Sequence, residues 1–262
     1  ATNTTGASNV GIGRNSLRAN TTASNNTAVG TDSLCANTTA SNNTAVGTSA
    51  LAANTTSTQN TAVGFCALAT NTAGGQTAVG HNALKAATSG YSNTAVGAFS
   101  GDATTSGNSN VAMGYESFTD NTEGDCNVAL GRGSLANNTT ADNNTAVGAC
   151  SLFANTTGAD NAAFGRQALY SNTTAAQNVA IGTCALYTTT TGANNTSVGN
   201  YSSKLNTTGA NNVAFGYAAL CSNTTASDGV AVGCGALLAN TTGAENVAIG
   251  KRSLWKNTTA TN

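Results

Sequence analysis

The chain of 262 residues has no proline and very little charge, and each shortage excludes a class of protein. Charged residues make up 7% of the sequence, against about 25% in an average soluble protein. The formal net charge is only -1, which does not suit a surface that wraps nucleic acid. No apolar run approaches the ~18 residues that a membrane-spanning helix needs. We therefore expect neither a nucleic-acid partner nor a membrane span.

Side chains for catalysis and metal binding are also scarce. His81 is the single histidine, which excludes a multi-histidine metal site. Cys66 lies at a nearly matching place in the neighbouring repeat, but a Cys–His pair there has no third catalytic member. An acidic cluster lacks the regular aspartate spacing of calcium-binding β-rolls. It consists of Asp102, Glu116, Asp120, Glu123 and Asp125. The sequence predicts no enzyme, no metal site and no cofactor.

What the chain has in place of these features is a short repeat. If the Asn of "NTAVG" is position 1, the repeat reads N-[TV]-A-[VI]-G-x-x-[AS]-L-x-x-N-T-T-[GA]-x-x, and it occurs fifteen times. Thirteen of the fourteen spacings between the position-5 glycines are 17 residues, and the spacing from Gly64 to Gly80 is 16. Because the repeat fills the sequence, we expect one repeat domain over residues 1–262, as a section of a longer fibre.

The period determines the fold class. Seventeen residues are too few for a helical hairpin, which needs about 33. Positions 1 to 5 alternate like a short strand, and the glycine that follows suits a corner with positive φ. One repeat buries too little alone, so it must stack on its neighbours at about 4.8 Å. The expected fold is an all-β parallel β-solenoid (β-roll) with one 17-residue coil per repeat, fifteen coils in all. Proline is absent because it would interrupt the ladder between coils.

The repeat positions predict which side chains face inward. We expect positions 2, 4 and 9 to form the core, for example Val29, Phe215 and Leu34, and the Asn columns at positions 1 and 12 to form amide ladders. Positions 6, 7, 10 and 11 should face outward, because they hold all nine basic residues and six of the seven cysteines. The short repeat near Gly74 and Gly75 predicts a local kink.

Two groups on the outward positions are candidates for binding. Position 10 is aromatic in three consecutive repeats, at Phe153, Tyr170 and Tyr187. This ladder is either a stacking platform for sugar rings or packing within the stack of coils. The last repeat carries a basic and aromatic patch that suits a polyanion or a solvated end. The patch comprises Lys251, Arg252, Trp255 and Lys256.

The "NTT" at positions 12 to 14 is an N-glycosylation sequon, and it also suits a structural ladder of Asn and Thr at a turn. The candidate glycosylation sites are Asn3, Asn20, Asn37, Asn54, Asn138, Asn155, Asn172, Asn206, Asn223, Asn240 and Asn257.

The motif "NTAVGxxALxxNTTG" resembles the repeats of bacterial and phage tail-fibre-like proteins. It is also similar to the head repeats of trimeric autotransporter adhesins, through Asn26–Gly30 ("NTAVG") and Asn178–Gly182 ("NVAIG"). The adhesin resemblance implies a left-handed parallel β-roll, three chains side by side and a role in surface attachment. In such a homotrimer, the small side chains at position 3, such as Ala28, would make the close contact between chains.

These observations predict a structural and adhesive extracellular fibre shaft, on a cell-surface appendage or a phage-like virion. Its partners would be further copies of itself, as a homotrimer or fibre assembly, and cell-surface carbohydrate. The alternative is an ice-binding β-solenoid, because position 14 supplies a column of threonines such as Thr22 and Thr39. Against this alternative, adjacent Thr-Thr residues point their hydroxyls in opposite directions.

Overall fold

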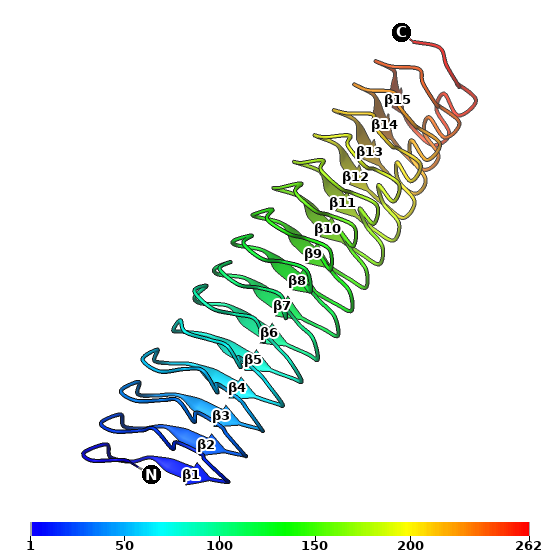
Figure 1. The fold of residues 1–262 in the computed structure, drawn as a ribbon. Helices are drawn as coiled ribbons and strands as arrows, with labels where there is room; N and C mark the ends of the chain where they lie inside the picture. The colour runs from blue at the N-terminus through cyan, green and yellow to red at the C-terminus, as the bar shows by residue number, and fades with distance from the viewer. Residues whose placement is uncertain (1, 262) are drawn as a thin grey trace. The chain divides into compact units, whose positions relative to one another are not determined.

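The computed structural model describes residues 2–261, which form short β-strands and contain no helix. Every strand has three residues, at positions 2 to 4 of the repeat. The chain divides into two compact units, Ala1–Ala129 (unit 1) and Leu130–Asn262 (unit 2). Each unit is a parallel β-solenoid, with one coil per repeat (Figure 1). The fold class predicted from the period is confirmed.

The strands of each unit follow one another in sequence order and pair in parallel. Unit 1 holds β1 (Val10–Ile12), β2 (Thr27–Val29), β3 (Thr44–Val46), β4 (Thr61–Val63), β5 (Thr77–Val79), β6 (Thr94–Val96) and β7 (Val111–Met113). Unit 2 holds β9 (Thr145–Val147), β10 (Ala162–Phe164), β11 (Val179–Ile181), β12 (Thr196–Val198), β13 (Val213–Phe215), β14 (Val230–Val232) and β15 (Val247–Ile249). The remaining strand, β8 (Val128–Leu130), falls where the chain divides.

The 16-residue repeat keeps the strand register, since Thr61 still pairs with Thr77. The missing residue is absorbed in the turn after Asn71. That side chain donates to the carbonyl of Ala73, two residues on, at 2.6 Å, whereas the equivalent Asn elsewhere reaches three residues on. Gln76 replaces Asn at position 1, and its longer side chain still accepts a hydrogen bond from the backbone N–H of the next coil.

The core is narrower than expected, and the prediction for positions 2 and 4 is wrong. From β2 onward, the side chain that points inward from each strand is the small one at position 3: Ala28 is 0% exposed, whereas Phe215 at position 4 is 56% exposed. Position 9 was predicted correctly, and Leu34 is buried. Alternation alone allows either face of a strand to point inward. The coil interior is already occupied by Leu and Asn side chains, and only Ala, Gly or Ser fits beside them.

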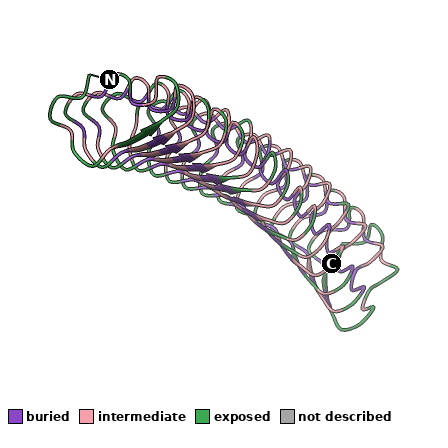
Figure 2. Ribbon diagram, turned by 90° about the horizontal axis from the view of Figure 1, so that it is seen from below, coloured by how far each residue is buried: buried purple, intermediate pink, exposed green. Residues whose placement is uncertain are grey.

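The same finding corrects the expected role of position 3 in contacts between chains. Ala28, Ala45, Ala62 and Ala146 lie inside the coil and reach no outer surface. The burial pattern is intermediate–buried–intermediate in β2 and exposed–buried–exposed in β15. In β1 all three residues are exposed, as Figure 2 shows in green.

The corners of the coil depend on unusual backbone angles. The position-5 glycines have φ far in the positive range, for example 136° at Gly165. The position-9 leucines also lie in the left-handed region, with φ of 47° at Leu34 and 48° at Leu152. A leucine in this region costs about 1 kcal/mol or more, which its full burial offsets. Burial of this leucine column therefore holds the turn in place.

Two columns of asparagine join the coils, as predicted. At position 12, Asn37 donates from Nδ2 to Oδ1 of Asn20 at 2.9 Å and to the carbonyl of Ala40 at 3.0 Å. At position 1, Oδ1 of Asn26 accepts from the backbone N–H of Asn43 at 2.9 Å. Both columns are buried. The amides thus satisfy backbone groups that the short strands leave unpaired.

Candidate functional site

The outward face of the strands, made of positions 2 and 4, carries exposed apolar side chains, and we call it the strand face. Its most exposed members in unit 2 are Phe215 and Ile249, at 56% and 71%. In unit 1, β2 to β6 repeat Thr-Ala-Val five times, so this part of the face alternates Thr and Val. Apolar side chains exposed in a row of this kind are uncommon on the surface of a monomeric protein.

The aromatic ladder of unit 2 forms as predicted, but its rings face one another. Phe153 and Tyr170 lie 5.2 Å apart with planes at 5°, and Tyr170 and Tyr187 lie 5.2 Å apart at 11°. Both faces of Tyr170 are therefore covered by its neighbours. One edge of the Phe153 ring lies close to Gly133, where an added Cβ would be 3.6 Å from the ring. This geometry suits packing within the stack of coils better than a platform for sugar rings.

Unit 1 contains a second aromatic stack that sequence reasoning missed. Phe65 stacks on His81 at 5.3 Å, His81 meets Phe99 edge-on at 4.9 Å, and Phe99 meets Tyr115 at 6.3 Å. Phe65, His81 and Tyr115 share position 6, so an alignment by repeat position contains the signal, although Phe99 is displaced to position 7. The single histidine, His81, therefore has a packing role, because its ring lies between those of Phe65 and Phe99. Among the described residues, no hydrogen bond joins it to Cys66.

The structure gives most of the sequon asparagines a place inside the coil. Nine of the eleven are buried at 0–1% exposure, namely Asn20, Asn37, Asn54, Asn138, Asn155, Asn172, Asn206, Asn223 and Asn240. Their Nδ2 atoms donate to the backbone three residues on, as Asn155 does to Gly158 at 2.9 Å. A glycan on Nδ2 would replace these bonds and require the coil to open. Only Asn3 and Asn257, at the two ends, are exposed or half-buried.

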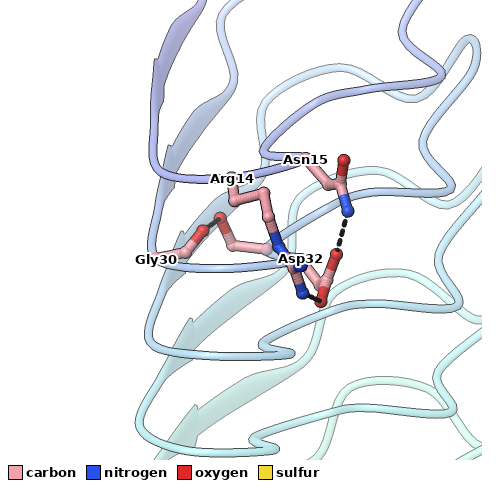
Figure 3. A network of polar contacts seen from close by, with 5 residues as sticks. Arg14, Asn15, Gly30 and Asp32 are labelled. Atoms are coloured by element: carbon pink, nitrogen blue, oxygen red, sulfur yellow. Dashed lines mark hydrogen bonds and ion pairs between the residues drawn. The ribbon is translucent and has the colours of Figure 1, made fainter.

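Charged side chains on the outward positions interact across coils. In unit 1, Asp32 accepts a hydrogen bond from Nδ2 of Asn15 at 2.8 Å and lies 3.9 Å from the guanidinium of Arg14 (Figure 3). In the last coil, Arg252 and Lys256 lie 5.9 and 4.9 Å from the ring of Trp255. Cation–π contacts therefore bring together three residues of the basic and aromatic patch, Arg252, Trp255 and Lys256.

The outward positions also hold most of the cysteines, and all seven are free thiols. Cys184 is buried, whereas Cys126 and Cys234 are exposed. Burial raises the pKa of the Cys221 thiol, and the nearby Lys204 lowers it in part.

One carboxyl of the acidic cluster has an altered pKa. Partial burial raises the pKa of Asp102 above 3.8, the nearby Asp120 and Glu116 raise it further, and Lys85 opposes them. Within residues 2–261, no group of three or more His, Cys, Asp or Glu side chains is arranged to hold a metal ion. The neighbouring carboxylates of the cluster therefore act on the pKa of Asp102.

Because the pKa of Asp102 is raised in the folded state, the stability of the protein depends on pH in a known direction. The folded state holds the proton more tightly than the unfolded state, so stability falls as the pH rises above about 4. We expect Asp102→Asn to raise the melting temperature at pH 7 and to leave it nearly unchanged at pH 3.5. Melting temperatures of the wild-type protein and of Asp102→Asn, measured across this pH range, test this prediction. Parallel curves for the two proteins would contradict it.

The described residues include no helix, and so none that is long and apolar enough to cross a bilayer. In comparisons with known proteins, the sequence matches no protein-family model, and no curated protein matches it. The strand face, the aromatic stacks and the charged outward positions are therefore the observations on which a function must be based.

Proposed function

We propose that this chain is a shaft section of an extracellular fibre, on a cell-surface appendage or a phage-like virion, in which three copies pack through the strand face. The observation that carries the proposal is the exposed apolar residue at position 4 of the strands. In unit 2 these residues include Phe164, Ile181, Phe215 and Ile249. A bare column of this kind is unfavourable in water and favourable when another chain covers it.

Two further features support a shaft. The coils have no insertions that could form a cleft, and each coil continues the hydrogen-bond ladder of the one before. Such an array is extended by adding coils, without any change in its cross-section. Attachment to carbohydrate would use outward positions away from the strand face, such as position 11.

The trimer is tested by measuring the mass of the particle in solution, with a matched pair of variants. Light scattering of the chain should give three chains per particle. Ile181→Asp, at 41% exposure on the strand face, should release single chains that keep their β-sheet circular dichroism. Leu205→Asp, at 42% exposure on position 11, should leave the trimer intact. A wild-type chain that is monomeric at all concentrations would contradict the proposal.

Ice binding is the second candidate, and one observation favours it. The five Thr-Ala-Val strands of unit 1 place threonine and valine in register on one face. The position-14 threonines are exposed, but those at position 13 are used inside the stack: Thr21 donates from Oγ1 to the carbonyl of Thr38 at 3.1 Å. Thermal hysteresis of a monomeric chain would favour ice binding over the fibre.

A further inference from the structure

Unit 2 has a hollow between two arginines on its outward surface. It has a volume of about 320 Å³ and is lined by Arg132, Ala149, Cys150, Arg166 and Gln167. Arg132, Ala149 and Arg166 occupy position 6 in three consecutive coils. The hollow exists because the middle residue is alanine, whose short side chain leaves the space between two long ones empty.

The two arginines that line the hollow differ from Arg14 in the residue found at position 7 of the next coil. In unit 1, Arg14 at position 6 is met by Asp32 at position 7 of the next coil. The corresponding residues next to Arg132 and Arg166 are Cys150 and Cys184. No ion pair to either arginine is present in the part of the chain that the structure describes. The hollow therefore carries two positive charges that its neighbouring coils do not neutralise.

The acidic residues of unit 2 lie on the other side of the strands. All four are at position 16 or 17, just before a strand begins, whereas position 6 follows the strand. They are Asp142, Asp160, Asp228 and Glu245. We call positions 16 and 17 the leading margin of the strand face, and position 6 its trailing margin.

In two coils the margins carry opposite charges at the same level. Asp160 stands two residues before β10 and Arg166 two residues after it. Glu245 and Lys251 flank β15 in the same way. Each pair is separated by a three-residue strand and the corners at its two ends, and no ion pair joins its two charges within residues 2–261. Within one chain, these opposite charges do not neutralise each other.

We propose that the arginine hollow receives the leading margin of a second copy of this chain, with Asp160 of one chain against Arg166 of the next and Glu245 against Lys251. This inference rests on the proposed trimer. If strand faces point toward a common axis, the trailing margin of each chain meets the leading margin of the next. Rotational symmetry about that axis keeps equivalent residues at equal heights, so charges that match within one coil also match between chains.

The geometry of Asp160 suits this contact. It is exposed, and its Oδ1 accepts one hydrogen bond from Asn143 at 3.2 Å, which orients the carboxylate and leaves Oδ2 for a guanidinium. Arginine binds carboxylates through two parallel hydrogen bonds. Asp228 differs in one respect: it accepts a similar bond from Asn211 at 3.1 Å, but the residue two positions after its strand is Cys234. It therefore has no basic partner at its own level.

This difference provides a matched control for a charge-reversal experiment on the full chain. Arg166→Glu and Asp160→Lys should each raise the concentration at which half of the trimer dissociates by at least about tenfold. The double variant should return it close to the wild-type value, because it restores opposite charges. Asp228→Lys, which makes the same charge change at the same repeat position, should have much less effect. Sedimentation over a concentration series measures all four.

The outcomes separate this inference from the proposed function. A wild-type monomer overturns the trimer and the margin contact together. A stable trimer that neither reversal weakens, or a double variant without rescue, overturns the margin contact and leaves the trimer standing. Binding to heparin, a sulfated glycan, is measured in parallel. If Arg166→Glu abolishes heparin binding while the trimer is unchanged, the hollow binds an anionic glycan and the inference is wrong.

Discussion

Gly165→Ala is expected to destabilise unit 2 by about 4 kcal/mol or more. Gly165 has a φ of 136°, which side chains rarely adopt. A Cβ at this position would lie 2.7 Å from the carbonyl carbon and oxygen of Gly182 in the next coil. That backbone cannot move away easily, because the N–H of Gly182 donates to the carbonyl of Phe164 at 2.7 Å.

Gly235→Ala is the matched control for this substitution. Gly235 also has positive φ, at 65°, but the nearest atom to an added Cβ is Cγ of Arg252 at 3.6 Å. Ala218 already adopts φ of 54° at the same repeat position. We expect a cost of about 1 kcal/mol. Urea unfolding followed by circular dichroism measures both variants, and equal midpoints would contradict the close packing of the glycine corners.

Asn155→Asp should be the second most damaging change, with a loss of about 3 to 5 kcal/mol at pH 7. Asn155 is fully buried and donates from Nδ2 to Oδ1 of Asn138 and to the carbonyl of Gly158, both at 2.9 Å. A carboxylate would place an acceptor oxygen against each of these oxygens. The position-12 amide thus carries two donors that an acid cannot replace.

The same variant should have a characteristic pH dependence. Burial and the facing oxygens raise the pKa of the new carboxyl in the folded state, so its protonated form is favoured there. Stability should therefore fall as the pH rises above about 4, the ordinary value for an aspartate. Asn194→Asp is the control, because Asn194 is exposed at position 17, where Asp160 and Asp228 already occur with the same positive φ. A change within about 0.5 kcal/mol is expected there. Equal pH profiles for the two variants would contradict the buried amide ladder.

The repeat period predicts the fold class and the strand positions directly, because a 17-residue coil with a glycine corner has few other solutions. The column of Leu34 and the ladder from Asn20 to Asn37 follow from the same positions and are confirmed. Which face of each strand points inward does not follow from the repeat period. Thr27 and Val29 alternate with Ala28, and alternation is equally compatible with either face pointing inward.

The sizes of the residues at positions 3 and 4 indicate which face of the strand points inward. The exceptions to Ala there are Gly11 and Ser197, which are equally small, whereas position 4 varies up to Phe164 and Phe215. A position limited to small residues indicates a tight interior, and a position of variable size indicates an open face. The hollow beside Arg166 is harder to predict, because it depends on Ala149 lying between two arginines at the same repeat position in adjacent coils.

The central claim is that the strand face is covered by other copies of the chain. Cryo-electron microscopy of the assembled protein tests it most directly, because a cross-section shows how many chains surround the axis and which side of each coil faces it. We predict three chains with Ile181 and Phe215 at the axis and the aromatic ladder of Tyr170 on the outside. Particles of a single chain, or a trimer with the strand face in solvent, would contradict the account.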